Sequence, residues 1–267
     1  MIRKRFRRGK DSQLFLPTRI AAYLVYFFLI LPSLVVIPMS FGNKMEFEFP
    51  PSTISLFLYE QFFSDKIWTS SVIQSFYVAF GTVGLSLVLG VSAAYGLVRA
   101  KFPGSRILTI IFVSPMLVPV IVVALGLYLY LSSFHLSGTT VGLVLGHTVI
   151  ATPFVIVTCM GGLRHVDEKL ETVARVLGAN RFLTFMKVTL PSLQPAMFAG
   201  ALFAFLISFD EVVIAWFVTS PQTMTLPVKM YSSIRWEISP ILAAISTMLT
   251  VISVATCLLA ALAQKRK

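Results

Sequence analysis

Charged residues are scarce in this chain of 267 residues. They make up 12% of the sequence, whereas about a quarter of the residues of a soluble domain are charged. Apolar residues make up 57%, and the mean hydropathy is +0.85. A soluble fold of this length cannot bury so much apolar surface, so the composition excludes a water-soluble protein and predicts an all-α protein that spans a membrane several times.

Several residue types and motifs that carry chemistry are also rare or missing. Cysteine occurs only as Cys159 and Cys257, both within apolar runs, which excludes a disulfide framework. The three histidines, His135, His147 and His165, are too dispersed to suggest a metal site. The sequence has no Gly-x4-Gly-Lys-Ser/Thr loop for ATP and no Ser/His/Asp or Cys/His arrangement. We therefore expect no catalytic residue, no metal and no cofactor, and a protein that is not itself an enzyme.

Long apolar runs are what the sequence has in abundance. A spanning helix needs about 20 mostly apolar residues, and six segments meet that length. The six segments are 20–41, 70–98, 107–133, 139–160, 195–218 and 239–263. They predict a six-helix membrane domain over 20–263, preceded by a basic segment, 1–19, and followed by a basic tail, 264–267.

The distribution of basic residues predicts the orientation of these helices. The net charge is +11, and all but four of the 22 Lys and Arg residues fall in the termini and in the second and fourth connections. The four exceptions are Lys44, Lys66, Lys229 and Arg235. Because cytoplasmic loops carry an excess of Lys and Arg, both termini are predicted to be cytoplasmic. The basic N-terminal run fits anionic membrane lipid, and the basic residues lie in short connections, which does not indicate nucleic-acid binding.

Within the spans, prolines and small residues predict helix shape and packing. Pro115 and Pro119 should kink or break the third span. Gly200, Ala204 and Ser208 are spaced by four and should let helix backbones approach closely. On the external side, we expect an ordered cap over 42–69, a tight turn at 134–138 and a short surface helix at 230–236.

The connection between the fourth and fifth spans, 164–195, is longer than two neighbouring helices require. Apolar residues recur at helical spacing there, in the order Leu170, Val173, Ala174 and Leu177. Gly178 should stop this helix, Asn180 should cap a second one, and Leu190-Pro191 should end it. The pattern fits either a helical knob that docks on another protein or a loop that lies on the membrane.

The residues of this connection resemble the permease signature of bacterial ABC importers. The stretch 171–179, Glu-Thr-Val-Ala-Arg-Val-Leu-Gly-Ala, is followed by Phe185, Val188 and Leu190-Pro191 at the spacings of that signature. The positions of the family's Glu-Ala-Ala triplet are Thr172-Val173-Ala174, where only the last residue agrees, and Glu171 lies one residue earlier. The resemblance implies a segment that couples to an ATPase. The coupling residues that it implies are Glu171, Ala174, Leu177, Gly178 and Ala179.

Further stretches resemble permeases of the spermidine/putrescine type. They lie at 208–214, 225–230, 238–240 and 243–247, so the resemblance covers nearly the whole chain. It implies a type I ABC importer permease of the bacterial inner membrane that takes up a polyamine. It also implies three partners: a cytoplasmic ABC ATPase dimer that hydrolyses ATP, a second permease subunit of different sequence, and an external substrate-binding protein. Related permeases for iron, thiamine, opines and phosphonate compounds share much of the pattern.

Asp210 and Glu211 are the only acidic residues inside the six predicted spans. A charge at mid-membrane costs about 2.5–3.5 kcal/mol on insertion scales, so such residues commonly have a function. One hypothesis is that one of them, Glu211 in preference, borders the translocation path and attracts a cation. The alternative is a polar contact or ion pair between subunits. A third interpretation, an ion-coupled secondary carrier that uses both carboxylates, predicts transport without ATP.

Overall fold

The computed structural model describes residues 11–100, 102–236 and 238–264, and these residues form helices, turns and loops without a strand. The described residues fall into two compact units, one from 1–66 with 233–267 and one from Ile67–Ser232. Residues 1–10 and 265–267, which hold most of the two predicted basic terminal segments, lie outside the described residues. The all-α class predicted from composition is confirmed.

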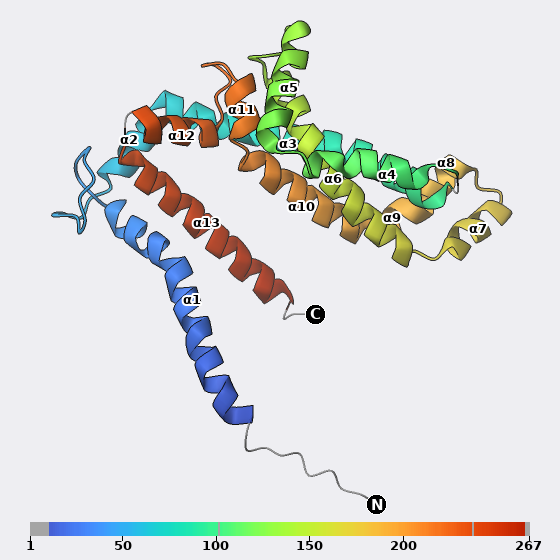
Figure 1. The fold of residues 1–267 in the computed structure, drawn as a ribbon, viewed down its shortest axis with the longest axis horizontal. Coiled ribbons are helices and arrows are strands. Elements are labelled where there is room, and N and C mark those ends of the chain that lie inside the picture. The colour runs from blue at the N-terminus through green and yellow to red at the C-terminus, as the bar shows by residue number, and fades with distance from the viewer. Residues whose placement is uncertain (1–10, 101, 237, 265–267) are drawn as a thin grey trace, which may run out of the picture. The chain divides into compact units, whose positions relative to one another are not determined.

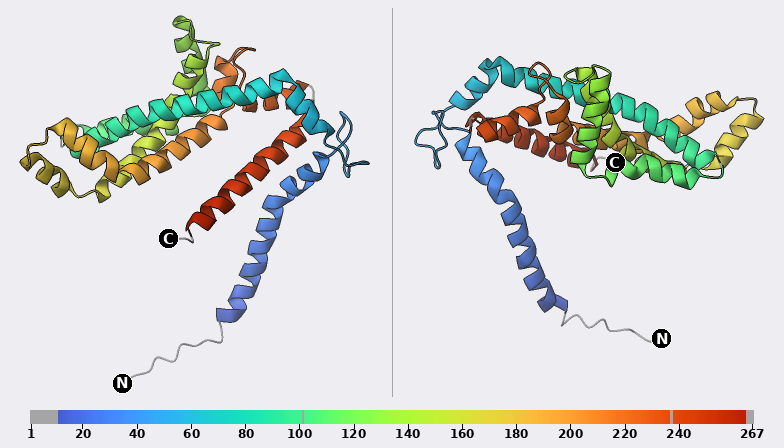
Figure 2. Two further views of the ribbon diagram at one scale, coloured as in Figure 1. Left: turned by 180° about the vertical axis from the view of Figure 1, so that it is seen from behind. Right: turned by 45° about the horizontal axis from the view of Figure 1, so that its top comes forward.

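Three long helices form the body of the larger unit. They are α3 (Lys66–Arg99), α6 (Thr140–His165) and α10 (Gln194–Phe209), which lie side by side in Figures 1 and 2. Their shared core consists of Val91, Ala94, Ala151, Val155, Cys159, Leu163, Leu193 and Ala204. These eight residues form an apolar part of the interface among the three helices.

Glycines set how closely these helices approach. A Cβ added at Gly90 on α3 would lie 2.7 Å from the Val155 Cγ1 of α6, and one at Gly200 on α10 would lie 2.8 Å from the Thr158 Oγ1. Both distances are shorter than a carbon atom tolerates, so only glycine allows the observed packing. Gly200, Ala204 and Ser208 are all buried, which confirms the packing role predicted from their spacing.

The third predicted span is broken. It consists of α4 (Ser105–Val113), a 3-10 turn (Ser114–Met116) and α5 (Val120–Ser133). The two halves meet at an angle of 97°. Pro115 lies in the 3-10 turn and Pro119 precedes α5, and neither can donate the backbone hydrogen bond that a continuous helix needs. The predicted break is confirmed, and α5 packs against α11 (Val213–Val218).

The fifth span is interrupted as well. The connection 164–195 contains α7 (Glu168–Val176), α8 (Arg181–Thr184), a π-helical turn (Phe185–Thr189) and α9 (Leu190–Ser192). The run Arg181–Ser192 then bends by 73° into α10. Beyond α10, residues 210–212 break the helix before α11 begins.

The smaller unit contains α1 (Asp11–Met39), α2 (Phe57–Ser64) and α13 (Ile241–Gln264), with α13 in contact with both of the others. The hydroxyl groups of Ser40 and Tyr59 lie 2.7 Å apart and join the end of α1 to α2. Large apolar side chains along α1 are exposed, including Phe28 at 72%. Such a helix is stable in contact with lipid or another apolar chain rather than with water.

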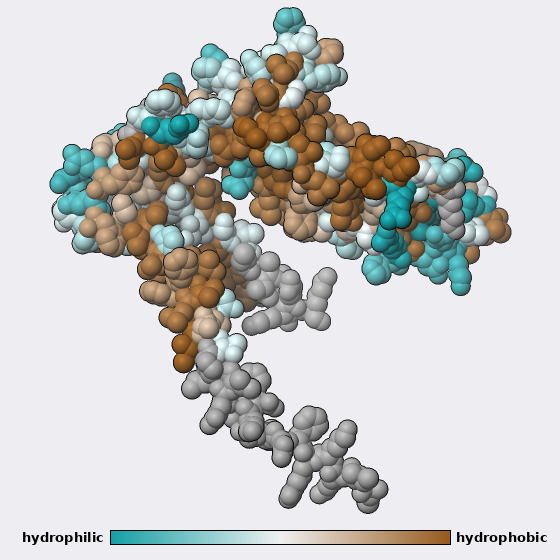
Figure 3. Space-filling model, viewed as in Figure 1, coloured by the Kyte–Doolittle hydropathy of each residue, from teal (hydrophilic) through white to brown (hydrophobic). Residues whose placement is uncertain are grey.

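By length and composition, Thr18–Met39, α3 and α6 can each cross a membrane, and the two bent pairs bring the number to five. The apolar part of α13, Ile241–Thr256, is the remaining candidate, so the arrangement is consistent with six spans. Apolar surface covers α4 and α6 in Figure 3, whereas the end formed by α7 and α8 is mostly hydrophilic. The predicted external helix is α12 (Leu226–Trp236), which begins four residues earlier than expected.

Candidate coupling site and intramembrane acidic residues

Helix α7 has a defined start. The Asp167 carboxylate accepts a hydrogen bond of 2.9 Å from the Lys169 backbone N–H, which satisfies one of the amides that a helix leaves unpaired in its first turn. Glu168 and Glu171 lie in that turn, where negative charge suits the helix dipole. The start of α7 is therefore stabilised both by a side-chain cap and by the charge of its first turn.

Helix α7 ends in a Schellman motif built on Gly178. The Ala179 N–H donates to the Ala174 carbonyl and the Gly178 N–H donates to the Arg175 carbonyl, each at 3.0 Å. Gly178 has φ +94°, in the left-handed region that residues with a Cβ avoid. A Cβ at this position would meet no atom within 4 Å, so the backbone conformation alone requires glycine. The glycine stop predicted from the sequence is confirmed.

The second helix of the segment also starts as predicted, because the Asn180 Oδ1 accepts a hydrogen bond of 2.8 Å from the Leu183 N–H. The helical run ends at Ser192, one residue beyond the end predicted at Leu190-Pro191. Pro191 lies near the start of α9, where a helix tolerates a residue without an N–H, and the chain continues to Ser192 before it bends. The π-helical turn accommodates this continuation, with the Leu190 N–H donating to the carbonyl of Phe185, five residues back.

Helix α7 presents apolar side chains to the outside. Leu170 and Val173 are 52% and 56% exposed, and Val176 and Leu177 are each 81% exposed. Beside them, a groove of about 350 Å³ is formed between α7 and α8. The groove is lined by Ala174, Leu177, Gly178, Ala179, Leu183, Thr184, Lys187 and Val188. Four of the five predicted coupling residues therefore line this groove: Ala174, Leu177, Gly178 and Ala179. Together with the exposed Leu170, Val173 and Val176 they form what we call the α7 docking surface.

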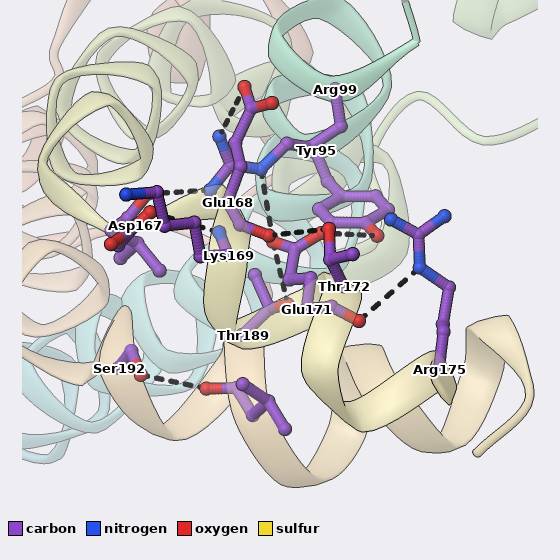
Figure 4. Close-up of polar contacts among 12 residues, drawn as sticks. Tyr95, Arg99, Asp167, Glu168, Lys169, Glu171, Thr172, Arg175, Thr189 and Ser192 are labelled. Carbon is purple, nitrogen blue, oxygen red and sulfur yellow. Dashed lines mark hydrogen bonds and ion pairs between the residues drawn. The ribbon is translucent and has the colours of Figure 1, made fainter. Parts of the chain in front are cut away.

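Glu171, the fifth predicted coupling residue, does not line this groove and instead contacts Arg99 and Thr189 (Figure 4). It is only 5% exposed, and its Oε1 accepts hydrogen bonds of 3.0 Å from the Arg99 Nε and from the Thr189 Oγ1. The Tyr95 hydroxyl lies 3.5 Å from the Oε2 of the same carboxylate. Glu171 thus joins α7 to α3 and to the π-helical turn instead of facing outward.

Arg99, Tyr95 and Thr189 were not among the predicted site residues. Arg99 ends α3, and the sequence indicated only that it lies at a basic membrane boundary. The available signal was the position of Glu171 itself. At about 100° per residue it lies roughly 100–160° around the helix axis from Leu170, Val173 and Val176, so it points away from their face. Which arginine would pair with it could not be read without the tertiary structure.

The two acidic residues in the fifth span differ in environment. Glu211 is 8% exposed, and its carboxylate accepts hydrogen bonds of 3.0 Å from the Val213 and Ala215 backbone N–H groups at the start of α11. Asp210 is exposed and borders a hollow of about 510 Å³ with apolar walls, to which Ile150 and Leu206 contribute. Both carboxylates line this hollow, and Asp210 is the more exposed of the two.

His147 lies beside Glu211 within the described spans. Its Nδ1 is 2.9 Å from the Ser208 Oγ, and its Nε2 is 3.9 Å from the Glu211 Oε2. The Ser208 hydroxyl in turn donates to the Thr82 Oγ1 at 3.3 Å. These hydrogen bonds connect α6, α10 and α3.

Residues 86–267, which include the whole candidate site, match the family described as the binding-protein-dependent transport system inner membrane component. The chain belongs to this family. The spermidine/putrescine transport system permease protein PotC of Haemophilus influenzae is 29% identical over 247 residues, which cover 91% of this chain and 95% of that protein. The putrescine transport system permease protein PotI of Escherichia coli (strain K12) is 32% identical over 241 residues, 87% of this chain and 85% of that protein.

A solved structure shares the fold of this inner membrane component. It is a bacterial ABC transporter involved in the import of the acidic polysaccharide alginate, and one of its chains superimposes with a TM-score of 0.76 at 16% identity over 96% of this chain and 98% of that chain. The protein is thus a multi-pass inner membrane transport permease, not an enzyme. Membership of a binding-protein-dependent system implies an ATPase, a binding protein and a second permease as partners.

Proposed function

We propose that this chain is the membrane-spanning subunit of an ATP-driven importer for a polyamine, spermidine or putrescine. It forms the translocation path with a second permease chain of different sequence, and both of its termini lie in the cytoplasm. An ABC ATPase dimer docks on the cytoplasmic side and an external binding protein delivers the substrate. The support for the substrate class is the similarity over most of the chain to permeases named for spermidine and putrescine.

The observation that carries the coupling role is the α7 docking surface. Leu170, Val173, Val176 and Leu177 are exposed on a helix whose two ends are capped and whose opposite side is ion-paired. Full burial of one such side chain contributes about 1.5–3 kcal/mol, so a groove on the ATPase that covers this surface gains several kcal/mol. An ordered apolar helix of this kind transmits a displacement, which a loop lying on lipid does not.

Asp210 is the residue that we assign to the path. Its exposed carboxylate lies at the break between α10 and α11, beside a hollow that is also lined by Glu211 and by Ile150, Leu206, Ile207, Val212 and Val213. A carboxylate attracts the ammonium group of a polyamine, and apolar walls suit its methylene chain. Glu211 holds the break in place by accepting the first amides of α11.

Uptake by the assembled importer in lipid vesicles tests the function. Radiolabelled spermidine or putrescine is supplied with the binding protein outside and ATP on the ATPase side, with thiamine and ferric iron as competitors. We expect uptake that requires both ATP and the binding protein and is competed only by polyamines. Uptake driven by a proton gradient without either component would instead establish the ion-coupled carrier.

A matched pair of variants separates the two acidic residues. Asp210→Asn removes a charge that faces the hollow, and at water-like dielectric one such interaction contributes about 1 kcal/mol, or roughly fivefold in the KM for polyamine. Glu211→Gln keeps a side chain of the same size at the start of α11 and should change the thermal stability of the complex more than the KM. An unchanged KM in Asp210→Asn would exclude Asp210 from the path.

A further inference from the structure

The burial of Glu171 needs an explanation beyond the docking of α7. A carboxylate removed from water costs several kcal/mol unless charged or polar groups compensate it. Two strong contacts do so here, because the Arg99 Nε and the Thr189 Oγ1 each lie 3.0 Å from its Oε1. The side chains of Arg99 and Glu171 are only 10% and 7% exposed, so water screens their attraction little.

Arg99 does more than neutralise one carboxylate. Its NH1 lies 3.1 Å from the Glu168 Oε1, and its NH2 donates a hydrogen bond of 2.9 Å to the Val166 carbonyl. With Glu171, the guanidinium therefore has acceptors at the end of α6 and on the first turn of α7 (Figure 4). Only the planar fork of arginine can reach three acceptors in this arrangement, since lysine offers a single point charge.

A polar cavity of about 340 Å³ lies on the other side of this contact. Arg175, Arg181, Thr172 and Thr184 contribute to its walls, together with Arg99 and Glu171. The cavity therefore separates part of the end of α3 from α7, and the Arg99–Glu171 pair bridges the two helices beside it. Tyr95 also contacts Phe185 of the π-helical turn edge-on, with 4.8 Å between ring centroids.

At its other end, α3 contacts the external part of the same unit. The Ser75 Oγ accepts a hydrogen bond of 2.8 Å from the Leu226 N–H at the start of α12, and the Lys229 ammonium lies 5.1 Å from the centroid of the Trp68 ring. Helix α3 is continuous over 34 residues, or about 50 Å at 1.5 Å per residue. One unbroken helix thus connects the α7 segment to the segment that starts α12.

We propose that Arg99 is a positioning residue that clamps the α7 segment to α3, so that a displacement of α7 moves α3 as a rigid rod. The inference rests on the proposed function, in which an ATPase displaces α7. The motion reaches the external side through Ser75 and Leu226, whose contact is buried. The clamp therefore determines how much of the displacement that the ATPase imposes on α7 reaches the external end of the path.

The assembled importer in lipid vesicles, with its ATPase, partner permease and binding protein, provides the test. We measure polyamine uptake and ATP hydrolysis together in Arg99→Gln, Arg99→Lys and the control Arg106→Gln, which changes an exposed arginine in the same connection. Arg99→Gln should assemble with the ATPase and hydrolyse ATP, but take up at least about tenfold less solute per ATP, the change that about 1.4 kcal/mol of lost positioning produces. Arg99→Lys should fall between Arg99→Gln and the wild type.

Two further experiments test the proposal if Arg99→Gln does not assemble: a double variant that swaps the charges of Arg99 and Glu171, and a distance measurement between α3 and α7. The double variant Arg99→Glu/Glu171→Arg should recover part of the uptake per ATP that either single variant loses. Spin labels at Ser92 on α3 and Thr172 on α7, both exposed and neither on the α7 docking surface, should keep one distance distribution in the nucleotide-free and ATP-trapped complex, which otherwise carries the wild-type residues.

The outcomes separate the clamp from the proposed function. A wild-type complex without ATP-dependent uptake would refute the function itself. If the wild type works, two results would overturn the clamp and leave the function standing. One is that Arg99→Gln and Arg99→Lys keep the same uptake per ATP as Arg106→Gln. The other is that the Ser92–Thr172 distance changes on ATP trapping.

Discussion

The conformation of Gly178 allows a substitution series whose outcome separates backbone strain from steric clash. Gly178 has φ +94°, and a Cβ there meets nothing within 4 Å. A left-handed conformation costs a residue with a Cβ about 1–2 kcal/mol, and asparagine bears it more easily than alanine because its side chain can bond to the local backbone. ATP-coupled uptake should therefore be highest with glycine at position 178 and should fall in the order asparagine, alanine and valine.

The size of the effect follows from the Schellman motif that Gly178 permits. The two 3.0 Å hydrogen bonds from Gly178 and Ala179 hold α7 in the form that presents Leu177. If the capped form is about 2 kcal/mol more stable than a frayed one, a cost of 1–2 kcal/mol reduces its population from nearly all to between half and four-fifths. The apparent Kd of the permease for the ATPase should then rise by up to about twofold in Gly178→Ala, and by more in Gly178→Val, whose side chain is β-branched.

The assay combines binding and transport. ATPase binding to the permease complex in detergent or nanodiscs gives the apparent Kd, and uptake in vesicles gives the functional consequence. Gly161→Ala is a suitable control, because a Cβ at this helical position of α6 also meets nothing within 4 Å and needs no unusual φ. If the order follows side-chain size, with alanine better than asparagine, the backbone explanation of Gly178 is refuted.

Two further predictions concern helix packing and capping. Gly90→Ala forces a Cβ to within 2.7 Å of Val155, so it should lower the free energy of unfolding of the complex by about 1–3 kcal/mol. The control Gly84→Ala places a Cβ with nothing within 4 Å and should be neutral or slightly stabilising. Equal melting temperatures of the two variants would contradict the close approach of α3 and α6. Asn180→Ala removes the 2.8 Å cap to the Leu183 N–H and should cost about 1 kcal/mol, seen as faster amide hydrogen exchange over α8 that is absent from Asn180→Ser.

Local patterns were sufficient to predict the ends of the helices in the α7 segment. The stop at Gly178 and the cap at Asn180 depend on residues within five positions along the chain, and such interactions are readable from sequence. The break at Pro115 and Pro119 belongs to the same class, because a missing N–H is a property of the residue itself. Its angle of 97° could not be predicted, since neighbouring helices set it.

The roles of the carboxylates needed the tertiary structure. Glu171 pairs with Arg99, which is 72 positions away in sequence, and no local rule identifies such a partner. The sequence favours Glu211 over Asp210 as the path residue, and this stays a prediction. The break after Phe209, which the sequence does not show, brings the Glu211 carboxylate onto the amides of α11, while both carboxylates line the hollow.

The π-helical turn at Phe185–Thr189 fixes the number of residues that this part of the chain must contain. One extra residue in the turn rotates Thr189 by about 100° relative to an α-helix, and this rotation brings its hydroxyl to 3.0 Å from Glu171. Removing a single residue between Asn180 and Thr189 would restore regular helical winding and carry that hydroxyl around to another side. Deletions in this stretch should therefore be tolerated far less than substitutions, whatever residues remain.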